Sequence, residues 1–224
     1  MSDSLRKYLA ELFGTFTLVF VGSVAILAAH GELGARFVLI AFAFGFALLA
    51  GLYAFGEVSG GHFNPIVSIA MVLDKRLAAS HLIPYWIAQF VGAVLASLVV
   101  LAAFDQDAVA ATATLPGASG AGTALLLEII ASAIFVIVIL RSTSSEKFGG
   151  TALVAIPLTL VAAHLALIPF SGSSLNTARS FGPELIGNEW TDFWVYVVGP
   201  PLGGILGWLV YSFVVRGKEA PAAA

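Results

Sequence analysis

Two asparagines, Asn64 and Asn176, occupy matching places in two segments that repeat along the chain. Residues 59–65 (SGGHFNP) align with residues 171–177 (SGSSLNT). A short run follows each asparagine, to residue 74 and to about residue 186, and roughly ten residues of helix cannot cross a membrane. Asn often caps a helix, and its amide group can also donate hydrogen bonds. A lone asparagine is usually only a cap, but two at equivalent positions favour a pair of facing donors that orient a small polar molecule.

Arg179 lies three residues after Asn176, among small and apolar residues. A charge at membrane depth indicates a functional site, and the guanidinium offers five donors. The alternative is a structural ion pair with Glu184 or another carboxylate. His164 and Phe44 lie in long apolar stretches. On sequence alone, a lone helical histidine there is more often a hydrogen-bonded core residue, and a phenylalanine is more often bulk that faces lipid.

Glu11 and Glu128 are carboxylates within apolar stretches, again at matching places in the two halves. They could carry protons, as acids in transporters do. We favour a structural role, in which each accepts hydrogen bonds from backbone N–H groups of a non-helical segment, because an unpaired N–H in a membrane costs several kcal/mol. The sequence offers no series of Asp and His residues to relay a proton.

The surrounding chain is very apolar. Hydrophobic residues make up 59% of the 224, charged residues make up 10%, and the mean hydropathy is +1.00, whereas soluble domains carry about 25% charged residues. Six stretches are long enough to cross a hydrocarbon core of about 30 Å, and they run approximately over 8–29, 37–55, 82–104, 122–140, 151–170 and 193–215. We expect the first stretch to be retained and no second, soluble domain. The absence of cysteine excludes disulfides and thiolate metal sites.

The distribution of basic residues predicts the orientation through the positive-inside bias. One side carries Arg6, Lys7, Lys75, Arg76, Arg141, Lys147, Arg216 and Lys218. The other side carries Arg36 and the acidic residues Glu32, Asp105, Asp107, Glu189 and Asp192. We therefore expect both termini in the cytoplasm and no basic cluster that would bind nucleic acid.

Each half of the chain, approximately 1–110 and 111–224, contains three spans, so the halves must be inserted upside down relative to each other. Inverted repeats place the functional site at the midplane, where the halves meet. The two short runs then form re-entrant half-helices, because irregular backbone at membrane depth must be buried or line a wet cavity. Their N-termini bring about half a positive charge each to the midpoint, which repels cations. The alternative is that both segments are ordinary loops, but the charge distribution requires each to enter the membrane and return.

Residues 59–65 (SGGHFNP), 176–183 (NTARSFGP) and 10–15 (AELFGT) resemble the signatures of the major intrinsic protein family, the aquaporins and aquaglyceroporins, and the resemblance covers essentially the whole chain. It implies a single channel domain over 1–224, with six transmembrane helices plus two re-entrant half-helices, that assembles as a homotetramer with one pore per subunit. The implied central constriction comprises Asn64, Pro65, Ile66, Asn176, Thr177 and Ala178. The implied selectivity filter comprises Phe44, His164, Ser173 and Arg179, and His62 is a further pore-lining candidate.

The chain departs from the family in both central boxes, where the usual Asn-Pro-Ala becomes Asn-Pro-Ile at 64–66 and Asn-Thr-Ala at 176–178. Thr177 lacks the preset φ of proline at a helix start, and Ile66 adds bulk where the two loops should interlock, so either change could alter the pore width. A bulky Phe with a His is similar to the filter of water-selective members. Glycerol-conducting members usually have a small residue in place of the His, and an Asp after the arginine, where this chain has Ser180.

We therefore expect an all-α, multi-pass protein of the cell (inner or plasma) membrane that conducts water passively through a single-file pore and excludes protons and ions. One alternative is a channel for small neutral solutes such as glycerol, ammonia or hydrogen peroxide. Others are a proton-coupled secondary transporter and, more weakly supported, a closed or adhesive protein without flux. No enzymatic activity, catalytic residue, cofactor or metal is expected. The expected partners are water or a small neutral solute, the lipid bilayer and further copies of the chain, and not nucleic acid.

Overall fold

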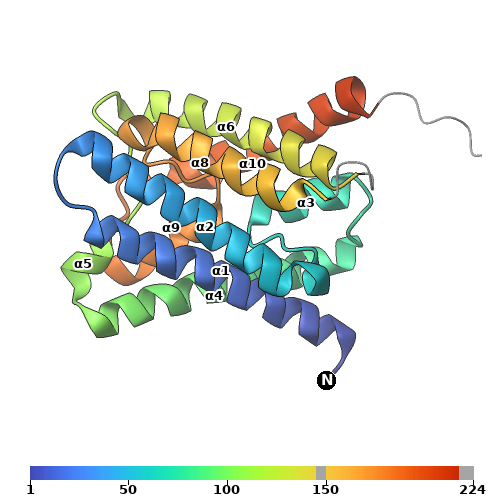
Figure 1. Ribbon diagram of the computed structural model, residues 1–224, viewed down its shortest axis with the longest axis horizontal. Coiled ribbons are helices and arrows are strands. Elements are labelled where there is room, and N and C mark those ends of the chain that lie inside the picture. Colours follow the sequence, from blue (N-terminus) through green and yellow to red (C-terminus); the bar gives the residue numbers. More distant parts are fainter. Residues whose placement is uncertain (145–149, 217–224) are drawn as a thin grey trace, which may run out of the picture.

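The computed structural model describes residues 1–144 and 150–216, and six long helices make up most of them. These are α1 (Asp3–Ala28), α2 (Leu33–Ser59), α4 (Leu82–Ala103), α6 (Gly120–Ser142), α8 (Ala152–Ser171) and α10 (Trp194–Val210), which run roughly alongside one another (Figure 1). A turn, η1 (Ala79–His81), precedes α4, and a π-helical turn, η2 (Tyr211–Val215), continues α10. Counted together with these two turns, all six are long and apolar enough to cross a membrane. The predicted six-span, all-α membrane fold is confirmed.

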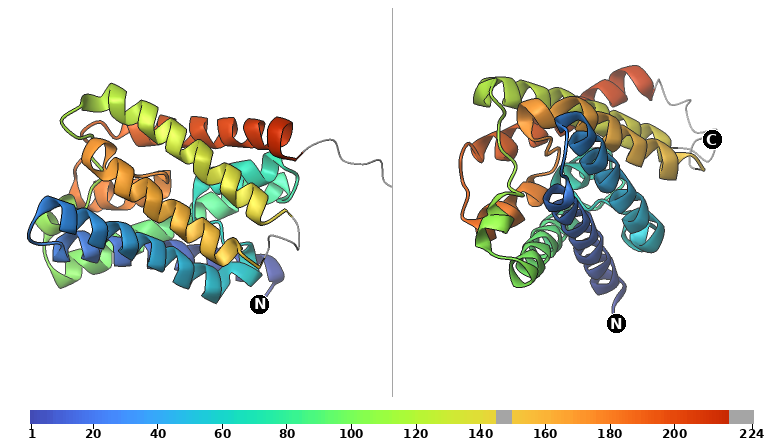
Figure 2. Two further views of the ribbon diagram at one scale, coloured as in Figure 1. Left: turned by 45° about the horizontal axis from the view of Figure 1, so that its top comes forward. Right: turned by 60° about the vertical axis from the view of Figure 1, so that its left-hand side comes forward.

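Two shorter helices, α3 (Pro65–Leu73) and α9 (Thr177–Gly187), lie between the long ones. In Figures 1 and 2, α3 lies toward the end of the molecule that holds the N-terminus, and α9 lies toward the opposite end, beside the short helix α5 (Gln106–Ala110). The two short helices contact each other, α3 packs against α10 of the second half, and α9 packs against α4 of the first half. Each short helix is therefore held by a long helix from the other half.

The long helices cross closely, and the crossings match between the two halves. Helix α1 packs against α4, and α6 packs against α10. Gly92 in α4 lies so close to the backbone oxygen of Leu12 that a Cβ would overlap it, and Gly203 in α10 has the same relationship to the backbone oxygen of Ile129. Small residues let the backbones of transmembrane helices approach in this way.

Polarity is arranged for a lipid environment, with apolar side chains outside and polar groups inside. Phe46, Ile134 and Val154 are 59%, 52% and 59% exposed on the outer surface. Glu11, Glu128, His164 and Arg179, by contrast, are buried in the interior. Ionisable groups within a membrane face the interior of a bundle or a wet cavity, so the interior of this bundle is where a functional site is expected.

Basic residues gather at the end of the molecule that holds the N-terminus. The start of α1, the loop after α3, the end of α6 and the end of η2 all lie there (Figures 1 and 2). These segments carry Arg6, Lys7, Lys75, Arg76, Arg141 and Arg216, while Lys147 and Lys218 lie outside the described residues. The grouping is the one that the charge distribution predicts. That this end faces the cytoplasm stays a proposal.

Candidate functional site

Each half-helix begins at one of the two asparagines, whose backbone is extended. The Oδ1 atom of Asn64 accepts a hydrogen bond from the backbone nitrogen of Ile66 at 3.1 Å. The Oδ1 atom of Asn176 accepts from the backbone nitrogens of Ala178 and Arg179 at 3.0 and 3.2 Å. These bonds satisfy N–H groups that the first turn of a helix leaves unpaired. The carbonyl of each side chain is thus used locally, and its amide nitrogen faces elsewhere.

The amide nitrogens of the two asparagines reach across the centre of the molecule. Asn64 Nδ2 donates to the backbone oxygen of Leu175, and Asn176 Nδ2 donates to the backbone oxygen of Phe63, each at 2.8 Å. An amide nitrogen carries two hydrogens, so each side chain keeps a second donor. Both asparagines line one narrow cavity, where these donors are available to a small molecule.

Glu11 of α1 holds the loop that precedes the first half-helix. Its carboxylate accepts hydrogen bonds from Ser59 Oγ at 2.6 Å, from the backbone nitrogens of His62 and Phe63 at 2.9 and 2.6 Å, and from Gln89 Nε2 at 2.8 Å. Glu11 is fully buried. The non-helical backbone therefore finds at membrane depth the acceptors that water would supply in a soluble protein.

Glu128 of α6 holds the second loop in an equivalent way. Its carboxylate accepts from Ser171 Oγ and from the backbone nitrogens of Ser174 and Leu175, each at 2.8 Å. Two tyrosine hydroxyls complete the correspondence, because Tyr85 donates to the backbone oxygen of Ser59 and Tyr196 to that of Ser171, both at 2.7 Å. The two loops thus share one pattern of hydrogen bonds.

The residue before each asparagine has a strained backbone. Phe63 and Leu175 have φ angles of 48° and 53°, in the left-handed region that costs a non-glycine residue of order 1–3 kcal/mol. In both residues the N–H donates to a buried glutamate and the carbonyl accepts from an asparagine. The strain therefore persists because every backbone polar group of these residues is held by a partner.

Phe44, His164 and Arg179 come together at one part of the narrow cavity. The Phe44 ring centroid lies 4.7 Å from that of His164, and Arg179 Cζ lies 5.0 Å from the Phe44 centroid. His164 Nδ1 lies 3.1 Å from the backbone oxygen of Leu160 and 3.3 Å from Ser173 Oγ. Because a carbonyl oxygen only accepts, that first bond needs a proton on Nδ1. In the described part of the chain, His164 Nε2 and Arg179 Nε have no hydrogen-bond partner.

Arg179 is held by the segment that joins the two halves. Its Nη1 donates to the backbone oxygen of Thr112 at 3.4 Å and, more closely, to Thr114 Oγ1. The alternative of a structural ion pair is wrong for the described residues, because no ion pair joins Arg179 to Glu184. The Glu184 carboxylate instead accepts from the backbone nitrogen of Thr114 at 3.0 Å, which positions the threonine that holds the arginine.

The narrow cavity adjoins a wider one toward the end of the molecule that holds the N-terminus. The narrow cavity is lined by Phe44, His164 and Arg179 and by both asparagines. The wider cavity includes Glu57, Gly60 and Gly61 in its lining. Leu48, His62 and Phe135 belong to both linings, so the two cavities adjoin there and together mark a candidate path. His62 lies where the two cavities adjoin, and its place beside a pore stays a prediction.

The other residues of the two central boxes lie away from this path. Pro65, Ile66, Thr177 and Ala178 are buried but line neither cavity. Ile66 packs against α10, where a Cβ on Gly204 would lie 3.2 Å from the Ile66 Cβ. The expectation that bulk at Ile66 intrudes between the two loops is therefore not met, because glycine in α10 leaves room for that side chain.

The departure at Thr177 has a local explanation. Its Oγ1 donates a hydrogen bond to the backbone oxygen of Tyr196 at 2.8 Å. That oxygen would normally accept from the residue four positions later in the helix, but this residue is Pro200, which has no N–H. Thr177 thus satisfies a carbonyl that proline leaves unpaired. The bond lies on the side of the half-helix that faces α10.

Three groups of partners are not predicted by the sequence. Gln89 bonds to Glu11, the hydroxyls of Tyr85 and Tyr196 bond to the loops, and Thr114 bonds to Arg179. The matched spacing of the two tyrosines in the two halves was a usable signal. Thr114 offered none, because the segment after α5 shows no periodicity.

Comparisons with known proteins agree with this architecture. The family described as major intrinsic protein matches residues 1–211. The chain is 40% identical over 221 residues to Aquaporin Z from Brucella melitensis biotype 1, and the alignment covers 93% of this chain and 97% of the relative. It is also 40% identical over 226 residues to glycerol uptake facilitator protein-like 6 from Lactiplantibacillus plantarum, with 96% and 100% covered.

Among solved structures, the X-ray structure of the aquaglyceroporin from Plasmodium falciparum superimposes with a TM-score of 0.86. The match covers 95% of this chain and 97% of the solved chain, at 22% sequence identity. At this level of identity, the similarity shows a shared fold. The family match extends over nearly all of the described residues, and the relatives match over almost their full lengths. The chain therefore belongs to the major intrinsic protein family.

Proposed function

We propose that this chain forms a passive water channel whose pore is the candidate path between the two half-helices. The observation that carries the proposal is the convergence of polar groups on one narrow cavity: the amide donors of Asn64 and Asn176 at its centre, with the Arg179 donor and the His164 Nε2 acceptor farther along. The similarity to Aquaporin Z over nearly the whole chain supports the same function. Family members are channels rather than enzymes, and we propose no catalytic activity.

Phe44, His164 and Arg179, with Ser173 behind the histidine, form the proposed selectivity filter. The short distances from Phe44 to His164 and to Arg179 leave little width, so a water molecule passes and a glycerol molecule does not. Arg179 Nε and His164 Nε2 have no partner among the described residues. They can therefore form hydrogen bonds with a passing water molecule, in place of those that it made with other waters in bulk solution. The guanidinium charge repels cations.

Asn64 and Asn176 form the proposed central constriction. Their remaining amide hydrogens point donors at a water oxygen, so that both hydrogens of that water face outward along the file. The N-caps of α3 and α9 are joined there through the bonds of Asn64 to Leu175 and of Asn176 to Phe63, and the two helix dipoles make the midpoint positive. A proton can therefore neither rest at this point nor hop through the oriented water.

The remaining assignments serve this pore. Glu11 and Glu128 keep the two loops in place, and Pro65, Ile66, Thr177 and Ala178 anchor the half-helices to the bundle. We propose inverted repeats at approximately 1–110 and 111–224, a homotetramer with one pore per subunit, and insertion in the plasma membrane with both termini in the cytoplasm. The grouping of basic residues at one end supports this orientation.

Stopped-flow light scattering on proteoliposomes tests the proposal. Vesicles that contain the purified protein should shrink rapidly in an impermeant osmolyte, with a low activation energy, and should not re-swell in glycerol. Empty vesicles of the same lipid give the background. Re-swelling in glycerol would identify a channel for small neutral solutes, as the name of the Lactiplantibacillus relative suggests for that protein. Saturable accumulation of a solute against its gradient would instead identify a transporter.

A further inference from the structure

A basic cavity lies outside the pore, at the end of the molecule that holds the N-terminus. It lies between the loop after α3, the end of α6 and the region of α10 and η2. Its described lining includes the basic residues Lys75, Arg76, Arg141 and Arg216 and one carboxylate, Asp74. The described lining is therefore strongly positive. The water pathway uses none of these side chains.

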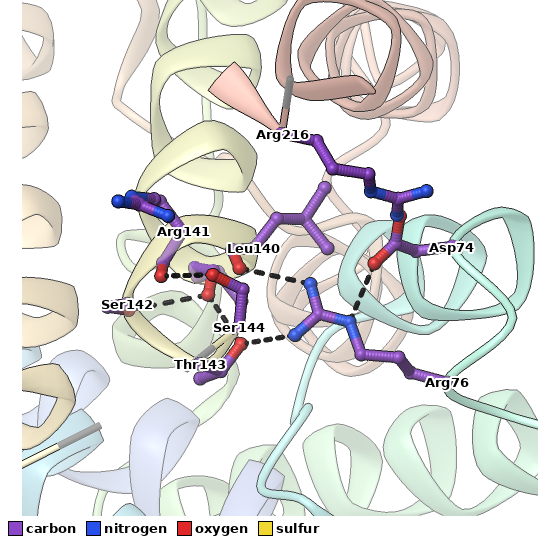
Figure 3. A network of polar contacts seen from close by, with 9 residues as sticks. Asp74, Arg76, Leu140, Arg141, Ser142, Thr143, Ser144 and Arg216 are labelled. Carbon is purple, nitrogen blue, oxygen red and sulfur yellow. Dashed lines mark hydrogen bonds and ion pairs between the residues drawn. The ribbon is translucent and has the colours of Figure 1, made fainter. Parts of the chain in front are cut away.

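The one carboxylate of the described lining is already shared by two arginines. Asp74 Oδ2 pairs with Arg76 Nε at 2.7 Å, and Asp74 Oδ1 pairs with Arg216 Nη2. The Asp74 side chain is only 3% exposed. Figure 3 shows the carboxylate between the two guanidinium groups. Both oxygens of Asp74 are therefore already used by arginines.

Arg76 is held in a fixed position by α6. Its Nη1 donates to Thr143 Oγ1 at 2.8 Å, and its Nη2 donates to the backbone oxygen of Leu140 at 3.0 Å (Figure 3). Partial burial lowers the pKa of Arg76, but a guanidinium is basic enough to stay charged at neutral pH. The cavity therefore has a preorganised positive wall.

Among the described residues, three further donors at the cavity, on Lys75, Trp208 and Ser212, are available to a ligand. Lys75 forms no ion pair among the described residues. The buried atoms Trp208 Nε1 and Ser212 Oγ belong to residues of the lining and have no hydrogen bond in the described part of the chain. A tetrahedral oxyanion offers several acceptor oxygens at once, and charge-assisted hydrogen bonds to it are strong. A phosphate group suits this set of donors.

The apolar surroundings indicate where that phosphate comes from. Phe213 and Val214 of η2 are 82% and 75% exposed, and Phe213 belongs to the cavity lining together with Trp208 and Tyr211. Aromatic rings beside basic residues at the end of a span are typical of the membrane interface, and basic pockets between helices bind phospholipid headgroups. We propose that the cavity binds the phosphate of an anionic membrane lipid, whose acyl chains lie along the exposed side chains of η2.

Native mass spectrometry of the full chain in detergent tests this proposal. The protein should bind phosphatidylglycerol more tightly than phosphatidylcholine, whose headgroup carries no net charge. Lys75→Gln should weaken phosphatidylglycerol binding by about fivefold, the effect of one basic residue near an anionic surface. Arg6→Gln removes a charge from the exposed start of α1 at the same end and should leave binding unchanged. Equal binding of both lipids, or equal losses in both variants, would overturn the proposal.

Quenching of tryptophan fluorescence tests the position of the bound lipid without changing any charged residue. Phosphatidylglycerol with brominated acyl chains should quench the part of the emission that Trp208→Phe removes, and brominated phosphatidylcholine should not. Inorganic phosphate at millimolar concentration should not displace the lipid; if it does, the cavity is a site for free phosphate and the lipid assignment is wrong. These measurements do not depend on water flux, so they stand or fall separately from the proposed channel function.

Discussion

Asn64 and Asn176 each donate a side-chain hydrogen bond to the backbone oxygen of the residue that precedes the other asparagine, and both bonds are 2.8 Å long. Each half-helix is thus tied to the loop of the other half at the point where the two meet. A shift of either loop would break both bonds. The geometry of the proposed constriction is therefore a joint property of the two halves.

We predict that Glu11→Gln and Glu128→Gln each lower stability. Glutamine replaces one acceptor oxygen by a donor nitrogen, so a buried N–H of the loop loses its partner, at a cost of about 1–3 kcal/mol. The temperature at which the protein aggregates in detergent, followed by size-exclusion chromatography, measures the effect. Glu57→Gln removes an exposed carboxylate and is the matched control. A Glu11→Gln protein of normal stability whose transport no longer follows a pH gradient would favour the proton-coupled alternative.

Thr177→Val should destabilise the protein without changing water permeability per folded channel. Valine has nearly the same shape but cannot donate to the Tyr196 oxygen, which Pro200 leaves without a helical partner, so we expect a loss of about 1–3 kcal/mol. Thr17→Val is the control, because Thr17 Oγ1 donates to the Phe13 oxygen within a regular stretch of helix. A normal midpoint of thermal unfolding for Thr177→Val would contradict the proposed role of the threonine.

The sequence is sufficient to predict the six spans and both half-helices, because apolar length and a repeated motif are local signals. It does not predict the helix ends, since α2 extends over Leu33–Ser59 rather than 37–55. Polar residues near the membrane surface can continue a helix, but they do not belong to the apolar stretch from which a span is predicted. The span limits in the sequence therefore mark the apolar core of each helix and not its full length.

The contacts of the altered box residues were not predictable from local sequence. The room for Ile66 depends on Gly204, and the bond of Thr177 depends on a proline one turn beyond Tyr196. Both partners lie in α10, far along the chain, and their proximity follows only from the exchange of half-helices between the two halves. The position of Thr114 against Arg179 likewise depends on how the connecting segment folds over α9.

Gly22→Ala should reduce water permeability several-fold. A Cβ at this position would overlap the ring of Phe44, and the ring can yield by moving toward His164 and Arg179, which narrows the proposed filter. Stopped-flow shrinkage per reconstituted protein measures the change. Gly34→Ala is the control, because nothing lies within 4 Å of a Cβ there. Equal permeability in the two variants would mean that Phe44 does not limit the flow.

His164→Ala should admit glycerol. The imidazole packs against Phe44 with ring centroids 4.7 Å apart, and its removal widens the path while Arg179 keeps its bonds to the connecting segment. Vesicles with the variant should re-swell in glycerol several-fold faster than those with the unmodified chain. Phe46→Ala removes a ring from the outer surface and should have no effect. If neither variant changes glycerol uptake, the narrow filter lies elsewhere.

Mercury should not inhibit the unmodified channel, because the chain contains no cysteine. Inhibition should appear in Leu48→Cys, since Leu48 lines both the narrow and the wider cavity and a mercury ion bound there obstructs the path. A thiol reagent should then restore the flow. Leu49→Cys provides the matched control, because the neighbouring side chain lines an apolar groove on the outside, between α2 and α8. Inhibition of Leu49→Cys but not of Leu48→Cys would place the water pathway outside the path between the half-helices.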